Sequence, residues 1–132
     1  MSNELHVYAI SDSLGETAYA IAEAASVQFP NADFKIQRYP LIKTVSLVQG
    51  ILNKAKREAA IIVHTFVDPE LSTFVNNYCQ ENGLSVIDAL SDVIQKFSQK
   101  AGEKPLQKAG INHNTDKEYF NRIEALEFAV TY

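Results

Sequence analysis

Short runs of apolar and β-branched residues recur along the chain, and turn or capping residues follow each of them. Runs of this length, bounded by Gly, Pro, Asn, Asp or Ser, are typical of β-strands. Four such runs predict four strands: Leu5–Ile10, Phe34–Tyr39, Ala60–Thr65 and Leu84–Ile87.

The segments between these runs carry apolar residues at helical spacing. In the clearest case, Asp68 can cap a helix, Pro69 can occupy its first position and Gly83 can end it. The apolar residues of this segment follow the i, i+3, i+4, i+7, i+8 pattern of one helical face. They are Leu71, Phe74, Val75, Tyr78 and Cys79.

Three further helical faces complete the pattern. They comprise Ala18, Ile21, Ala22, Ala25 and Phe29; Val48, Ile51, Leu52 and Ala55; and Leu90, Val93, Ile94, Phe97 and Ala101, with Gly102 ending the last. Strands that alternate with helices favour right-handed crossovers and a parallel sheet covered on both faces. We therefore expect an α/β fold with an open, doubly wound, Rossmann-like parallel sheet of about four strands, helices on both faces and a C-terminal helix. The pattern leaves the strand order open.

The alternation ends at Gly102, so the predicted α/β domain covers residues 1–102. Residues 103–132 contain Pro105 and Gly110 and are expected to form a linking loop and a final helix.

Thr115–Glu118 fits a capping box, in which the threonine and glutamate side chains each accept a hydrogen bond from a backbone amide at a helix start. A helix over about residues 116–130 would follow, with Phe120, Ile123, Leu126 and Val130 on one stripe. No glycine, proline or polar tail ends this helix before Tyr132. We therefore expect the sequence to stop short of a C-terminal domain.

Composition narrows the classes of function. The 132 residues, 46% hydrophobic and 21% charged, suffice for one ordinary core. A net charge of −4 with scattered lysines and arginines argues against a nucleic-acid partner. The sequence has no apolar run near the roughly 20 residues that cross a bilayer, and its start lacks a basic signal region, so we expect a cytoplasmic protein without membrane contact. Cys79 is the single cysteine and predicts neither a disulfide nor a metal site.

The loop after the first predicted strand is the main candidate for chemistry. Ligands of open parallel sheets bind beyond the carboxyl ends of the strands. Here Ser11, Asp12, Ser13, Gly15, Glu16 and Thr17 combine hydroxyls, a flexible glycine and free helix amides, which predicts a phosphate-like anion site. The loop matches neither the dinucleotide fingerprint nor the P-loop. The alternative is that Ser13 and Glu16 form a capping box that only begins a helix.

Two later strand ends add candidates. Arg38 and Lys43 could complete the anion pocket, although solvated surface charge is the commoner role of such residues. His64 and Thr65 point to opposite faces of the sheet. His64 within an apolar run fits a core histidine better than a base, whereas Thr65 at the strand end is the better ligand contact.

The segment before the predicted final helix supplies the remaining candidates. His113 and Asp116 are weak catalytic candidates, and Arg122 is a further anion contact, if that helix folds back toward the sheet edge. Their spacing defines no catalytic triad, so catalytic residues stay unassigned.

Several segments together point to a family. They are Ser11–Ala18, Arg38–Pro40, Thr65–Leu71, His113, Asp116, Glu118–Phe120, Arg122–Ala125 and Glu127–Ala129. Jointly they resemble the N-terminal part of the bacterial and plastid regulatory proteins of pyruvate, phosphate dikinase and phosphoenolpyruvate synthase, over nearly the whole chain. Leu14 departs from the threonine usual in that family, which removes one hydroxyl from the proposed anion site.

The resemblance implies a bifunctional enzyme. One activity is an ADP-dependent serine/threonine kinase that phosphorylates a threonine of the target dikinase or synthase and switches it off. The other is a phosphate-dependent pyrophosphorylase that removes the group. ADP and phosphate are implied for the full-length protein, whose P-loop-like segment lies in a C-terminal domain outside this sequence. No cofactor is expected in this part alone, and we expect it to lack kinase activity by itself.

Other interpretations stay open. The domain could be a noncatalytic module that docks the target or forms a homodimer and binds no small molecule. A flavodoxin-like ligand-binding domain is a further alternative, but the first loop lacks the aromatic and hydroxyl-rich surroundings of a flavin phosphate.

Overall fold

Four parallel strands form the centre of the structure, a computed structural model that describes residues 4–109. The strands are β1 (Glu4–Ile10), β2 (Asp33–Tyr39), β3 (Ile61–His64) and β4 (Val86–Asp88), in the order β2-β1-β3-β4. β1 pairs with β2 from Glu4↔Asp33 to Ile10↔Tyr39, and with β3 from Val7↔Ile61 to Ile10↔His64. The predicted α/β class and parallel sheet are confirmed.

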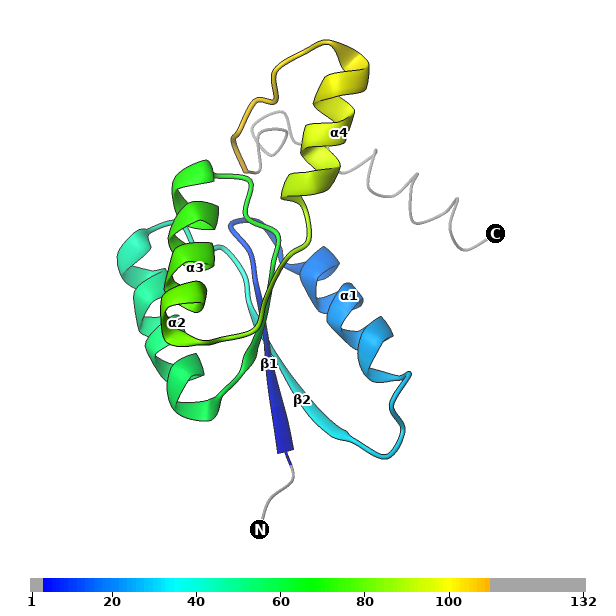
Figure 1. The fold of residues 1–132 in the computed structure, drawn as a ribbon, viewed down its shortest axis with the longest axis vertical. Helices are drawn as coiled ribbons and strands as arrows, with labels where there is room; N and C mark the ends of the chain where they lie inside the picture. Colours follow the sequence, from blue (N-terminus) through cyan, green and yellow to red (C-terminus); the bar gives the residue numbers. More distant parts are fainter. Residues whose placement is uncertain (1–3, 110–132) are drawn as a thin grey trace.

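Helices cover both faces of this sheet (Figure 1). They are α1 (Glu16–Ser26), α2 (Val45–Glu58), α3 (Pro69–Asn82) and α4 (Ser91–Ala101). α2 and α3 pack side by side on one face, whereas α1 lies on the other (Figure 1). α4 stands beyond the carboxyl ends of the strands (Figure 1). The predicted final helix at residues 116–130 lies outside the described residues.

Alternation along β1 divides the core into two layers. Tyr8 and Ile10 are buried against the α2–α3 face, whereas Val7 and Ala9 are buried against α1. This is the period-two geometry of a strand covered on both faces. Because β2 and β3 flank β1, the connections after β1 and β2 run in opposite directions, and the sheet has its switch point between β1 and β3.

The helix ends follow local chemistry. Asp68 caps α3 by accepting from the Glu70 amide at 2.9 Å, Pro69 begins the helix, and Gly83 ends it at φ 67°, as predicted. Gly102 ends α4 at φ 67°, also as predicted.

One expectation for the first helix was wrong. Phe29 does not belong to the helix: α1 ends at Ser26, and Phe29 is 58% exposed. Pro30 disfavours helical backbone at Phe29, so a helix that includes Phe29 is unfavourable. Of the other residues on the predicted face, Ala18 and Ala22 are buried, whereas Ile21 and Ala25 are exposed.

Candidate functional site

The loop after β1 is held between two other loops at the carboxyl edge of the sheet. The Ser11 amide donates to the Tyr39 carbonyl at 3.0 Å, and the Leu41 amide donates to the Ser13 carbonyl at 2.8 Å. Leu41 adopts a φ of 58°, which is uncommon for a residue other than glycine. The loop that follows β2 therefore fixes residues 11–13 from one side.

The Asp12 side chain fixes the same loop from the other side. Asp12 is 2% exposed, and its carboxylate accepts from the amides of Val67, at 3.1 Å, and Asp68, at 3.0 Å. Burial raises the pKa of Asp12, and these amide donors oppose that effect only in part. Asp12 was predicted to contact an anion, but the structure gives its carboxylate the role of bridging the loops after β1 and β3.

α1 begins without a side-chain cap. Its N-cap is Gly15, in the left-handed conformation at φ 81°, so the alternative of a capping box between Ser13 and Glu16 was wrong. The Ser11 hydroxyl instead accepts from the Ser13 amide at 2.9 Å. No side chain caps the amides of the first turn of α1, which include those of Glu16 and Thr17.

Arg38 brings a cation to this helix start. Its guanidinium donates to the Leu14 carbonyl from Nε, at 3.2 Å, and from Nη2, at 2.8 Å. A Cβ placed on Gly15 would lie 3.4 Å from Arg38 Nε. The structure therefore brings together two predicted anion contacts, Gly15 and Arg38, that are far apart in the sequence.

The other predicted contacts are placed differently. Glu16 and Thr17 are exposed on the first turn of α1, and Lys43 is exposed before α2. Thr65 is buried, and its amide donates to the Ile10 carbonyl at 3.1 Å. Anion binding by these residues stays a prediction, and His113, Asp116 and Arg122 lie outside the described residues.

His64 belongs to a buried hydrogen-bond network, as its apolar surroundings predicted. Its Nε2 lies 2.9 Å from Asn76 Oδ1, and its Nδ1 accepts from the Phe66 amide at 3.4 Å. Burial lowers the pKa of His64, although Asn76, Asp88 and Asp12 partly oppose the change. A fully buried, neutral His64 is suited to supporting this edge of the sheet.

Asp88 links the network to α4. It accepts from the Asn76 side chain at 3.1 Å and from the Ser91 hydroxyl at 2.6 Å. Burial raises the pKa of Asp88, but the hydrogen bonds from Ser91 and Asn76 and the nearby His64 outweigh it and hold the pKa below its ordinary value. Residues of β3, β4, α3 and α4 are thereby joined.

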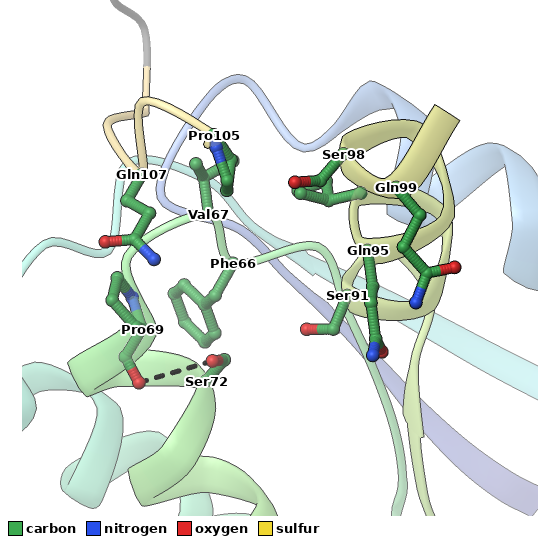
Figure 2. Close-up of a pocket in the computed structure, with 11 residues that line it drawn as sticks. Phe66, Val67, Pro69, Ser72, Ser91, Gln95, Ser98, Gln99, Pro105 and Gln107 are labelled. Carbon is green, nitrogen blue, oxygen red and sulfur yellow. Dashed lines mark hydrogen bonds between the residues drawn. The ribbon is translucent and has the colours of Figure 1, made fainter. Parts of the chain in front are cut away.

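A cavity that the sequence did not predict lies beside this network (Figure 2). It measures about 430 Å³ and opens between the start of α3, the side of α4 and residues 105–107. Val67 lines it, so the loop after β3 separates the cavity from Asp12. The tertiary approach of α4 and residues 105–107 to the start of α3 creates this space, and no motif in the sequence marks it.

Neither a metal-binding cluster nor a membrane-spanning helix is found in the described part of the chain. Residues 4–109 contain no cluster of three His, Cys, Asp or Glu side chains that could hold a metal ion. None of the helices within 4–109 is long and apolar enough to cross a membrane.

Comparison with known proteins gives one consistent result. Residues 7–132 match the family model described as kinase/pyrophosphorylase. A relative from Ligilactobacillus salivarius (strain UCC118), named "Putative pyruvate, phosphate dikinase regulatory protein", is 61% identical over 127 residues, which are 96% of this chain and 47% of the relative. A relative with the same name from Clostridioides difficile (strain 630) is 44% identical and covers 97% of this chain and 46% of its own length. A third from Oceanobacillus iheyensis, again with this name, is 38% identical and covers 100% of this chain and 49% of its own length. The chain spans about half the length of the curated relatives it matches.

Proposed function

The chain belongs to the kinase/pyrophosphorylase family, and from this membership we propose that it forms the phosphate-holding part of a regulatory protein of pyruvate, phosphate dikinase or phosphoenolpyruvate synthase. The longer protein transfers a phosphoryl group from ADP to a threonine of the target, which leaves AMP. In the reverse regulatory step, inorganic phosphate accepts that group and pyrophosphate is released. The start of α1 beside Arg38 is the observation that carries the assignment to this chain.

The α1 terminus supplies one half of the proposed phosphate site. A helix N-terminus carries roughly half a positive charge and presents amides that lack partners within the helix. At α1 the cap is Gly15, which has no side chain that could accept from these amides, so they stay available to an anion. The exposed Thr17 hydroxyl stands on the same turn.

Arg38 supplies the other half. Two of its N–H groups are used on the Leu14 carbonyl, which fixes the guanidinium beside Gly15. A guanidinium has five N–H donors, so others are left for a phosphate oxygen. Charge-assisted contacts of this kind are about twice as strong as neutral ones.

The negative charges near this site do not exclude the proposal. The Asp12 carboxylate is buried and directed to the amides of Val67 and Asp68. Glu16 is exposed and can turn toward solvent.

Phosphate titration of the 132-residue chain, followed by amide NMR, tests the proposal. We expect saturable shifts of the Glu16, Thr17 and Ala18 amides with inorganic phosphate, pyrophosphate or ADP. Arg38→Ala should weaken phosphate binding about tenfold or more, because a hydrogen bond to a charged group contributes about 1.5–3 kcal/mol. The phosphate affinity of Arg38→Lys should lie between the affinities of the wild-type chain and of Arg38→Ala.

Lys35→Ala is the matched control. Lys35 is an exposed cation on the same strand that pairs with Asp33 at 3.6 Å. If Lys35→Ala and Arg38→Ala weaken phosphate binding equally, the effect of Arg38 is only one of general charge. If phosphate does not shift the NMR signals of the α1 amides, the proposed site is contradicted.

A noncatalytic docking module is the second candidate. It is favoured by the exposed apolar stripe on α4, where Val93 is 45% exposed and Phe97 is 73% exposed. In that case the target protein would shift the α4 amides, whereas phosphate would leave the whole chain unchanged.

A further inference from the structure

We propose that an apolar groove between α1 and β4 binds an amphipathic helix of this same chain, formed by residues 116–130. The groove has a volume of about 210 Å³ and lies on the face of the sheet that α1 covers. Val63 and Ile87 line it from the sheet, and Ala25 and Phe29 line it from α1 and the segment that follows. The inference uses none of the side chains of the proposed phosphate site and stands independently of the proposed function.

The two faces of the sheet are covered unequally. Four strands about 4.8 Å apart make a surface wider than one helix of about 10 Å, so a face needs two helices side by side. On one face, α2 packs on β1 and α3 packs on β4 (Figure 1). On the other face, α1 packs on β1, β2 and β3, and it is the single helix that the described residues place there (Figure 1). A second helix position therefore stays open over β3 and β4.

The exposure of β4 marks this open position. Val63 and Ile87 are neighbours in the register of β3 and β4, and both side chains lie on the α1 face. Val63 is buried, whereas Ile87 is 43% exposed. On the opposite face, Ile62 of β3 is fully buried in the layer of α2 and α3. A large apolar side chain of the sheet is thus uncovered on the α1 face alone.

The lining of the groove suits an apolar surface. Ser26 carries the one polar side chain in this lining, and its hydroxyl donates to the Glu23 carbonyl at 2.8 Å. Within residues 4–109, no charged side chain lines the groove. A phosphate or a small polar ligand would lose its hydration here without gaining hydrogen bonds. The apolar side of an amphipathic helix loses no such bonds, and binding in grooves of this kind is a recurrent mode of recognition.

Residues 116–130 have the matching pattern in the sequence. The predicted apolar stripe consists of Phe120, Ile123, Leu126 and Val130. Asn121 and Glu124 fall on the other side of the same predicted helix. An isolated helix of this length is marginally stable in water, so its apolar side needs a partner surface. At about 1.5 Å per residue it would be about 22 Å long, which matches the roughly 23 Å of a strand the length of β1.

The end of the described range lies close enough for this segment to reach the groove. Pro105 and Gln107 line the cavity beside the start of α3, at the carboxyl edge of the sheet. Residues 110–115 span at most about 20 Å when extended, which exceeds the roughly 14 Å between the outer strands. α1, α2 and α3 all begin at this edge and run antiparallel to the strands. A helix that begins at residue 116 can therefore enter the groove from the same edge and run in the direction of α1.

Methyl NMR of the 132-residue chain tests the inference. We expect nuclear Overhauser contacts from the Ile87 methyl groups to those of Ile123 and Leu126. We also expect the amides of residues 119–129 to exchange slowly with solvent, because a helix of this length without a partner surface would give little protection. Ile87→Thr keeps a β-branched side chain but places a hydroxyl in the groove, and it should speed this exchange about tenfold.

Val93→Thr is the matched control for the groove. Val93 is also apolar, β-branched and 45% exposed, but it belongs to α4 and does not line the groove. Val93→Thr should leave the exchange of residues 119–129 unchanged. If Val93→Thr speeds the exchange and Ile87→Thr does not, the segment binds α4 and the inference is overturned.

A second pair of variants tests the proposed helix itself. Ile123→Asp places a charge on the apolar stripe and should release the segment from the groove. Ala125→Asp introduces the same charge on the opposite side of the helix and should leave the segment bound. Equal exchange rates in these two variants would contradict the proposed orientation of the stripe.

The other occupants of the groove give different results. If a second copy of the chain supplies the helix, the contact between Ile87 and Ile123 will appear between differently labelled chains in a mixed sample, which would contradict docking within one chain. If Ile87 shows no contact with residues 116–130 in the 132-residue chain, the groove binds something else and the inference is overturned.

Discussion

The backbone conformation of Gly15 sets the geometry at the start of α1. Its φ of 81° lies in the region that residues with a Cβ rarely adopt. The nearest atom to an added Cβ is Arg38 Nε at 3.4 Å, which is an ordinary contact distance. The cost of alanine at this position would therefore come from backbone strain and not from a steric clash. Glycine therefore both permits the turn and leaves the helix amides uncapped.

Gly15→Ala should lower the free energy of unfolding by about 1–2 kcal/mol, the cost of a left-handed conformation for a residue other than glycine. Gly50→Ala is the control, and we expect it to change the free energy of unfolding in the opposite direction. Gly50 lies exposed within α2, with no atom within 4 Å of an added Cβ, and alanine should stabilise the helix by about 0.5–1 kcal/mol. Urea unfolding measures both. Equal effects of the two substitutions would contradict the role assigned to Gly15.

His64 makes stability depend on pH. Burial lowers its pKa in the folded protein below the ordinary 6.5, so the unfolded chain takes up a proton first on acidification. The free energy of unfolding should therefore be insensitive to His64 above about pH 6.5 and fall below it, with a slope of at most about 1.4 kcal/mol per pH unit.

Urea unfolding between neutral pH and about pH 5 checks this sign. His64→Gln should be less stable at neutral pH but should show a flatter dependence of the free energy of unfolding on pH. An unchanged slope in His64→Gln would assign the dependence to another group.

At the scale of elements, α3 and α4 differ in what holds them. α3 buries Leu71, Val75 and Cys79, and its Asn76 joins the network of His64 and Asp88. α4 has no buried residue in the described structure and is tied to the sheet mainly through Ser91 and Asp88. α3 is thus part of the core, whereas α4 is attached at the edge.

Leu71→Ala should therefore destabilise the protein by about 2–5 kcal/mol, because it removes a side chain that is only 2% exposed. Phe97→Ala should change the free energy of unfolding by no more than about 0.5 kcal/mol, because Phe97 is 73% exposed. Denaturant unfolding compares the two. A loss above about 1.5 kcal/mol for Phe97→Ala would mean that the α4 stripe is covered in solution.

At the scale of the whole molecule, the strand order gathers the loops of the proposed phosphate site at one edge of the sheet. β1 lies between β2 and β3, so the loops after all three strands meet. The loop after β1 is hydrogen-bonded to the loop after β2 through Ser13 and to the loop after β3 through Asp12. The proposed site beside α1 and the cavity beside α4 thus lie on either side of the hydrogen-bonded loops after β1 and β3.

The 132-residue chain should bind phosphate without transferring it. Its sequence contains no G-x-x-x-x-G-K-[ST] segment, which provides both a phosphate cradle and its lysine. A radiolabelled assay with ADP and the target dikinase should therefore detect no phosphothreonine with this chain alone, and should detect it with a curated relative of full length. Transfer by residues 1–132 would contradict the division of roles.

Local patterns in the sequence predicted most of the elements. Asp68, Pro69 and Gly83 marked the ends of α3, and the apolar runs marked the strands to within a few residues. These signals act between residues close in the chain, through backbone preference, capping and periodicity. The same local reasoning failed at Ser13, where a capping box was an alternative, because Gly15 and the loop after β2 impose another geometry.

The sequence by itself determined an α/β chain with a Ser- and Gly-containing loop after its first strand, and it marked His64 as a core residue. Only the tertiary structure decided the order β2-β1-β3-β4, the approach of Arg38 to Gly15, the bridging role of Asp12 and the cavity beside α4. The physical reason is one of range. Strand pairing and side-chain contacts join residues that lie tens of positions apart, and the apolar runs that make each strand fit a sheet do not specify which neighbour it takes.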